Sequence, residues 1–176
     1  MKDSKLLDRA TVEKKYLWNA ESLFPTRDDW RREFEAARAA LPSVSGRAGT
    51  VAKAGASGLA DTLEAVFALM NRVGRLYVYS SMAQAVDSGD EEAQSLNDQA
   101  GGLFGQFQAA MSFLEPELIE LGKNTLDSWI ASEPRLSGYR HFADDLFRNQ
   151  EHVRSAEVEE LLGLVSEVFQ SADNTH

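Results

Sequence analysis

Two of the three histidines lie in one short stretch near the C-terminal end, YRHFADDLFRNQEHVRS, which covers residues 139–155. Histidine nitrogens and carboxylates are the groups that bind zinc and that carry general acid–base catalysis. A helical zinc site of the HExxH type needs two histidines four positions apart, a glutamate base and a further ligand. His141 has Asp145 in the fourth position after it, so the motif is absent. Because two donors do not hold a catalytic metal, we interpret His141 and Asp145 as a pair on a helix surface.

The other two histidines give no better candidate. His152 lies in the turn before a helix that we predict to begin at Ser155, and His176 is the last residue. We expect His152 to pack or hydrogen-bond within that turn, as a structural residue of a helix–turn–helix corner. We therefore predict no metal-binding residue in this chain.

Nucleophilic and phosphate chemistry lack their motifs as well. The sequence contains no cysteine and no GxSxG elbow, and the glycines of AGGLFGQ (residues 100–106) do not follow a strand and are not followed by GK[ST]. SGDEE, beginning at Ser88, lacks the alternating ligands of a calcium loop. We predict no catalytic and no cofactor-binding residue.

One aromatic cluster has two interpretations. RLYVYSSM, beginning at Arg75, places Tyr77 and Tyr79 on a predicted helix. Core packing with the hydroxyl groups at the rim is the simpler interpretation. The alternative is one wall of a peptide-binding groove.

Composition restricts the classes of partner. The net charge is −10 and the sequence pI is about 4.8, which disfavours nucleic acid and anionic membrane surfaces. The N-terminus has no apolar core of signal-peptide length, and the uncharged run at residues 76–86 is too short to span a bilayer. The absence of cysteine fits a reducing compartment. We expect a cytoplasmic protein.

Hydrophobic periodicity predicts an all-α fold. Residues 1–17 form a polar arm, and Trp18 to Thr26 form a loop with apolar anchors, with Thr26 as the N-cap of a helix that Pro42 ends. The Gly-, Ser- and Ala-rich stretch 42–58 predicts a loop. Two long helices follow, joined by a turn at residues 87–90, and form an antiparallel hairpin.

Shorter helices complete the prediction. We expect helices at residues 118–121 and 125–131, a break at Pro134, and a helix over 138–148 that Ser137 caps. A final helix begins at Ser155. Its apolar face would consist of Val158, Leu161, Leu162, Val165, Val168 and Phe169.

Four segments follow one another along the chain: WNAESLFPTRDDW, GRLYVYSSMAQAVDSGDEEAQSLNDQA, FLEPELIEL and YRHFADDLFRNQEHVRSAEVEELL. Their order resembles the N-terminal region of the oligoendopeptidase F family of zinc metallopeptidases. Asn19 stands where the family's opening segment has an aspartate. The matching positions are Trp18, Leu23, Phe24, Pro25, Trp30, Gly74, Arg75, Leu76, Tyr77, Val78, Tyr79, Phe113, Leu114, Glu115, Pro116, Glu117, Tyr139, Arg140, His141, Leu146, Arg148, His152, Ser155 and Glu159.

The resemblance implies a part of a larger enzyme. The family's HExxH motif and later glutamate ligand lie C-terminal to everything in this sequence, so none of its zinc-binding or catalytic residues can be placed here. Residues 18–176 would be a helical region, incomplete at its C-terminus, that forms part of the shell around a deep substrate channel for short peptides. Zinc would belong to the full-length family member. Apolar helix faces left partly covered would favour self-association.

Two functions from different classes follow. The first is the N-terminal part of a zinc-dependent oligoendopeptidase, inactive alone. The alternative is a free-standing, non-catalytic helical module that binds peptides or proteins. An active enzyme with unrecognised chemistry is disfavoured, because the known metal, nucleophile and phosphate motifs are all absent from the sequence.

Overall fold

The computed structural model describes residues 12–150 together with residues 158 and 161, and every element in this part of the chain is helical. The all-α prediction is confirmed. The α-helices are α1 (Arg27–Ser45), α2 (Val51–Val86), α3 (Glu91–Met111), α4 (Leu114–Leu121), α5 (Lys123–Ser132) and α6 (Arg140–Arg148). The described residues also form three short 3-10 helices: η2 (Lys14–Tyr16), η3 (Ala20–Ser22) and η4 (Pro134–Tyr139). Most of the final helix predicted from Ser155 lies outside the described residues.

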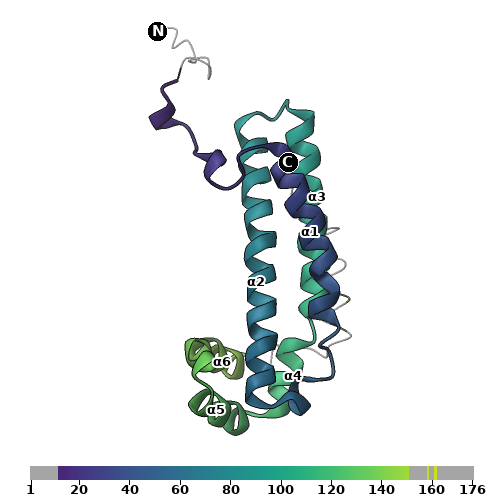
Figure 1. Cartoon of the computed structure of the whole chain (residues 1–176), viewed down its shortest axis with the longest axis vertical. Helices are drawn as coiled ribbons and strands as arrows, with labels where there is room; N and C mark the ends of the chain where they lie inside the picture. Colours follow the sequence, from purple (N-terminus) through teal and green to yellow (C-terminus); the bar gives the residue numbers. More distant parts are fainter. Residues whose placement is uncertain (1–11, 151–157, 159–160, 162–176) are drawn as a thin grey trace.

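The hairpin of α2 and α3 is the longest feature of the molecule (Figure 1). The α2 helix has 36 residues, which corresponds to roughly 54 Å at the usual rise per residue. The predicted turn at residues 87–90 is present, and Asp90 caps α3 by accepting a hydrogen bond from the Ala93 N–H at 3.0 Å. The stretch LYVYSSMAQAV is helical in spite of its β-forming residues, because it continues the apolar face of α2.

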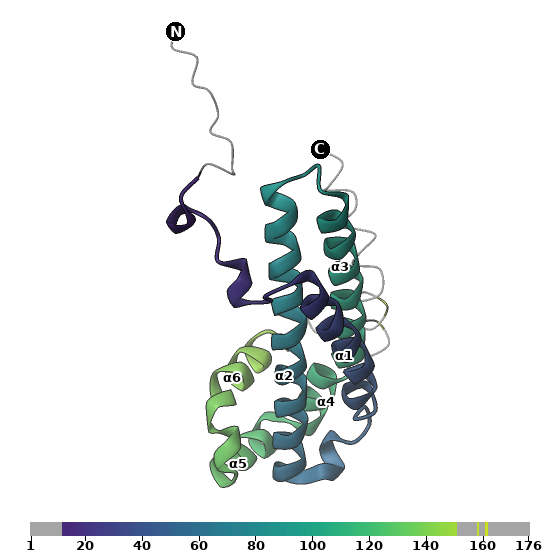
Figure 2. The same ribbon diagram turned by 45° about the horizontal axis from the view of Figure 1, so that its top comes forward.

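The α1 helix packs along both members of this hairpin (Figure 2). Thr26 caps it as predicted, with its hydroxyl oxygen accepting from the Asp29 N–H at 3.1 Å. Trp30 is fully buried, and its indole N–H donates to the Leu76 carbonyl oxygen of α2 at 2.9 Å. The Trp30 ring stacks on Phe34 at a centroid distance of 5.2 Å. These contacts fix the position of α1 on α2.

Two predictions about the α1–α2 connection are wrong. The α1 helix continues through Pro42 to Ser45. A proline three residues before the end of a helix removes one backbone donor, and the fully buried Val44 holds the last turn against the core. The loop predicted for residues 42–58 shortens to residues 46–50, because α2 begins at Val51 and absorbs an irregularity at Gly55 (φ 68°). Glycine tolerates that left-handed backbone conformation.

A carboxylate from α4 accepts hydrogen bonds from backbone N–H groups at the start of α2. The Glu117 side chain accepts hydrogen bonds from the Gly49 N–H at 2.5 Å and from the Val51 N–H at 3.2 Å. These N–H groups precede the first turn of the helix or lie within it, where no intrahelical partner exists. The N-cap residue Thr50 makes no side-chain cap hydrogen bond, because its hydroxyl donates to the Arg47 carbonyl oxygen at 2.6 Å. Glu117 therefore supplies the cap from a distant part of the sequence.

The shorter helices gather around one end of the hairpin (Figure 1). Phe67 of α2 contacts Tyr139 at 5.3 Å and Phe142 at 6.1 Å between ring centroids. Arg135 of η4 donates to Asp61 at 2.7 Å and to the Ser57 hydroxyl oxygen at 2.9 Å. The two aromatic contacts of Phe67 and the ion pair between Arg135 and Asp61 thus hold this group of helices against α2.

The predicted break at Pro134 is present, since α5 ends at Ser132 and Pro134 opens η4. The cap predicted at Ser137 is wrong. Ser137 lies inside η4, and Tyr139 precedes α6 without a side-chain cap. The 3-10 segment takes up the residues that we expected to initiate the helix, and its last residue leads directly into α6.

The segment before α1 is anchored at one end only. Phe24 is 7% exposed and meets Tyr79 edge to face at 5.5 Å, whereas Trp18 is 65% exposed. Trp18 is therefore not the buried anchor that we expected. Within the described part of the chain, no helix is both long and apolar enough to cross a membrane.

Candidate functional site

His141 lies on the exposed side of α6. Its Nε2 atom is 3.2 Å from an Asp145 carboxylate oxygen, and its side chain is 85% exposed. Arg148 also contacts Asp145, at 2.7 Å. The predicted pair is therefore present, and Arg148 is a second partner of the Asp145 carboxylate.

A zinc ion does not fit the residues that the structure describes. Among them, no group of three or more His, Cys, Asp or Glu side chains comes close enough together to hold a metal. His152 and His176 lie outside the described residues.

The two tyrosines of RLYVYSSM separate onto different sides of α2. Tyr79 is 9% exposed and packs on Phe24, as the core interpretation predicts. Tyr77 is 39% exposed, and its ring centroid lies 6.1 Å from that of Phe104 of α3. The neighbouring Val78 is 46% exposed. Only Tyr79 is a core residue, and Tyr77 and Val78 contribute to the surface.

A groove of about 540 Å³ lies between the first half of α1 and the middle of α2. Such a volume falls within the range of small-molecule sites, about 300–1,000 Å³. Its lining combines three arginines, two carboxylates and a small apolar wall: Arg32, Arg72, Arg75, Asp29, Glu33, Phe24 and Ala36. This groove is the candidate binding site among the described residues.

Two arginines of α2 line the groove at i, i+3 spacing. Arg72 donates through Nε to a Glu33 carboxylate oxygen of α1 at 2.5 Å. Arg75 donates through Nη2 to the Leu23 carbonyl oxygen at 3.0 Å, and its guanidinium lies 5.6 Å from the centre of the Phe24 ring. These contacts hold both guanidinium groups in place at the groove.

The carboxylates of the groove are also held. Thr26 donates its hydroxyl hydrogen bond to Asp29 at 2.7 Å, and Arg32 forms an ion pair with the same carboxylate. The Thr26 hydroxyl, followed by Arg32, lowers the pKa of Asp29 below its ordinary value. Asp29 is therefore ionised at neutral pH, as is required to balance Arg32.

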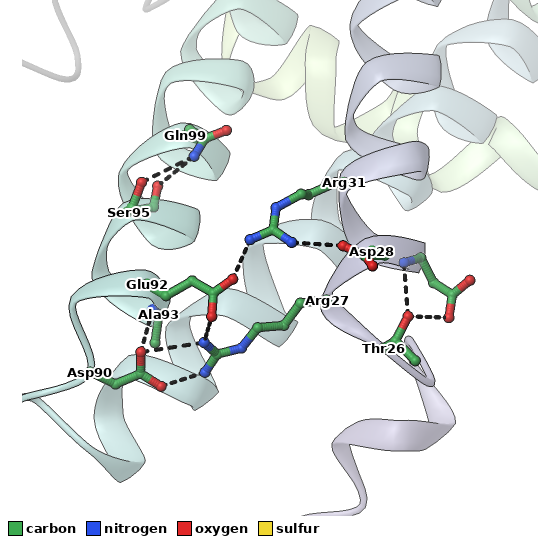
Figure 3. A network of polar contacts seen from close by, with 10 residues as sticks. Thr26, Arg27, Asp28, Arg31, Asp90, Glu92, Ala93, Ser95 and Gln99 are labelled. Atoms are coloured by element: carbon green, nitrogen blue, oxygen red, sulfur yellow. Dashed lines mark hydrogen bonds and ion pairs between the residues drawn. The ribbon is translucent and has the colours of Figure 1, made fainter.

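A separate charged network joins the N-terminal ends of α1 and α3 (Figure 3). Arg27 forms ion pairs with Asp90 and Glu92, and Arg31 joins Glu92 to Asp28, the last contact at 2.8 Å. Carboxylates in a first helical turn also complement the helix dipole. The network is a structural clasp between two helices, because every charged group in it faces a partner.

The ion pairs lower the pKa values of the Asp90 and Glu92 carboxylates. The hydrogen bond from Arg27 is the main cause that lowers the pKa of Asp90, and the Ala93 N–H adds to it. Hydrogen bonds from Arg27 and then Arg31 lower the pKa of Glu92. Both carboxylates thus stay charged to lower pH than free side chains would.

Sequence reasoning did not find the groove. No sequence pattern indicated a binding role for Arg72, Arg75 or Glu33. The available signal was two arginines at i, i+3 on a helix that has few other charged residues. That signal does not say which helix lies opposite.

The comparisons with known proteins agree on one family. The family described as Oligopeptidase F matches residues 117–176. Oligopeptidase PepF of Bacillus subtilis (strain 168) is 34% identical over 174 residues, which are 99% of this chain and 26% of that protein. Group B oligopeptidase PepB of Streptococcus agalactiae serotype III (strain NEM316) is 32% identical over 168 residues, 96% of this chain and 28% of that protein.

A solved structure has the same fold. The crystal structure of oligoendopeptidase-F from Enterococcus faecium superposes with a TM-score of 0.79 at 28% identity, and the match covers 85% of this chain and 29% of that one. This chain therefore spans between a quarter and a third of the length of these relatives. The resemblance predicted from four sequence segments is confirmed.

Proposed function

We propose that this chain is the helical N-terminal part of a zinc-dependent oligoendopeptidase, because it matches oligopeptidase F proteins in sequence and in fold. In this role it forms part of the shell around the substrate channel and supplies no catalytic group. The substrates of the whole enzyme are short peptides, and the compartment is the cytoplasm. Zinc and the HExxH motif belong to the part of such an enzyme that this sequence does not include.

One observation carries the proposal: the alignments cover nearly all of this chain but only about a quarter of the length of its relatives. Nearly all of this chain matches a 26% share of the B. subtilis oligopeptidase. The 176 residues contain no HExxH, and His141 pairs with Asp145 and not with further ligands. A region of this kind contributes walls and packing, and the chemistry takes place elsewhere.

The shape of the described helices suits a wall. The α2–α3 hairpin with α1 along it is long, and the shorter helices cover one end of it (Figures 1 and 2). A rigid helical layer beside a channel excludes folded proteins and admits flexible peptides. Substrate size would then be selected by access to the channel, before any contact with catalytic groups.

The groove supports a second candidate, a free-standing helical module that binds peptides without cleaving them. Its volume and its arginines suit a small charged ligand. The two candidates differ in what the gene encodes after the codon for His176.

The reading frame of the gene past that codon tests the proposal. If the frame continues into an HExxH motif and a later glutamate ligand, the chain is the N-terminal part of a zinc oligopeptidase. A stop codon at that position, with a stable product, would overturn the proposal in favour of the binding module.

A further inference from the structure

We propose that the groove between α1 and α2 binds the C-terminal carboxylate of a short peptide through Arg72 and Arg75. The inference rests on the proposed function in taking short peptides as the ligand. It adds a binding site on this chain and names the group that the site recognises.

The guanidinium groups of Arg72 and Arg75 have N–H donors that are not used in the described contacts. An arginine side chain carries five N–H donors in a planar fork that matches the two oxygens of a carboxylate. Within the described contacts, Arg72 uses only its Nε atom, toward Glu33, and Arg75 uses only Nη2, toward the Leu23 carbonyl oxygen. Both side chains line the groove, so their remaining N–H groups can bind a carboxylate without breaking either contact.

Both arginines are already held in position. Glu33 fixes Arg72 at 2.5 Å, and the Phe24 ring supports the Arg75 guanidinium at 5.6 Å. A side chain that is ordered before binding loses less conformational entropy when the ligand arrives. The same contacts set the spacing of the two forks along α2.

The rest of the lining fits the end of a peptide. Phe24 and Ala36 give an apolar wall for the last side chain. Asp29 and Glu33 balance two of the three arginines, so the groove favours a single negative charge over a polyanion. The overall charge of −10 also repels phosphate chains. Every short peptide has a terminal carboxylate whatever its sequence, whereas acidic side chains occur only in some peptides.

The test is binding of an N-terminally dansylated alanine pentapeptide to the whole chain, measured by fluorescence anisotropy. The peptide with a free C-terminal carboxylate should bind about tenfold or more tightly than its C-terminal amide, because charge-assisted hydrogen bonds are lost in the amide. An amidated peptide with glutamate as its last residue separates a side-chain carboxylate from the terminal one, and it should bind like the plain amide.

Variants locate the site. R72Q and R75Q should each reduce binding of the free acid about tenfold, while R38Q, which changes an exposed arginine of α1 paired with Glu35, should leave it unchanged. A36F fills the groove without altering its charge and should also abolish binding, with an unchanged thermal melt as evidence of folding.

Equal affinity for the acid and the amide, or full binding by both arginine variants, would overturn the proposal. Binding of the glutamate-ended amide as tightly as the free acid would overturn the assignment to the C-terminus. None of these outcomes bears on the reading frame past His176, so failure of the groove proposal is distinguishable from failure of the proposed function.

Discussion

Glu117 shows how far a single side chain can act along the sequence. Its carboxylate accepts the N–H groups of Gly49 and Val51 and so caps a helix to which it does not belong. Removing a cap of this kind costs on the order of 1 kcal/mol. This capping role predicts how a substitution of Glu117 changes the free energy of unfolding.

We expect Glu117→Gln to lower the free energy of unfolding by about 1 kcal/mol, because one carboxylate oxygen is replaced by a donor. Urea denaturation followed by circular dichroism measures it. Glu120→Gln is the matched control, because Glu120 is an exposed residue of the same helix. Equal midpoints for the two variants would contradict the capping role.

The clasp between α1 and α3 predicts a dependence on pH. Asp90 and Glu92 have folded-state pKa values below their ordinary values of 3.8 and 4.5. Their stabilisation is therefore complete above about pH 5 and is lost as the pH falls through the lowered values. Asp90→Asn should destabilise the chain at pH 7 and have a smaller effect near pH 3.

Thermal melts of Asp90→Asn and of the wild type across this range test the expectation. Asp98→Asn changes an exposed carboxylate of the same helix and should leave the pH profile of the wild type unchanged. A constant difference between Asp90→Asn and the wild type from pH 7 to pH 3 would show that charge at Asp90 does not matter.

Local residue patterns predicted some of these contacts and not others. Thr26 caps α1, and His141 faces Asp145, because each partner lies three or four positions away. The contacts of Glu117 and Arg72 join residues that are distant in the sequence. Nothing in a local pattern specifies such partners, since they depend on how the helices pack.

At the scale of elements, the hairpin followed from periodicity, and the α1–α2 connection did not. Composition alone made residues 42–58 a loop, but the buried Val44 and Val51 continue the two helices into that stretch. Burial outweighed the weak helix propensities of glycine and serine and the missing donor of Pro42. Helix ends are therefore the part of this fold that propensity describes worst.

Glycine positions within the helices give an element-scale prediction. A Cβ atom added at Gly101 of α3 would meet nothing within 4 Å, so Gly101→Ala should stabilise the chain by up to about 1 kcal/mol. Gly58→Ala in α2 should destabilise it, because the new Cβ atom would lie 2.3 Å from the Ala54 Cβ atom. Chemical denaturation of both variants tests the difference, and the same sign for both would contradict the packing described.

At the scale of the whole molecule, part of α2 presents an apolar surface to solvent. Met70, Tyr77 and Val78 are 37%, 39% and 46% exposed. Exposed apolar surface is typical of regions that another part of a protein or a partner covers. The groove and this surface both depend on the packing of distant segments, which is why sequence patterns left Tyr77 with two interpretations.

We expect the isolated chain to self-associate through this surface as its concentration rises. The double substitution Tyr77→Lys with Val78→Lys should shift the chain to a monomer in sedimentation velocity experiments, because it places charge on the apolar surface. Ala39→Lys, at an exposed site of α1, is the control for added charge. A wild-type chain that stays monomeric at high concentration would contradict the expectation.

We propose that these 176 residues form part of a peptidase and contain none of its catalytic groups. The most direct test is hydrolysis of a short, internally quenched fluorescent peptide by the purified chain in the presence of zinc. We expect no cleavage above the rate without protein. Cleavage that a chelator abolishes, and that decreases in a His141→Ala variant, would contradict it.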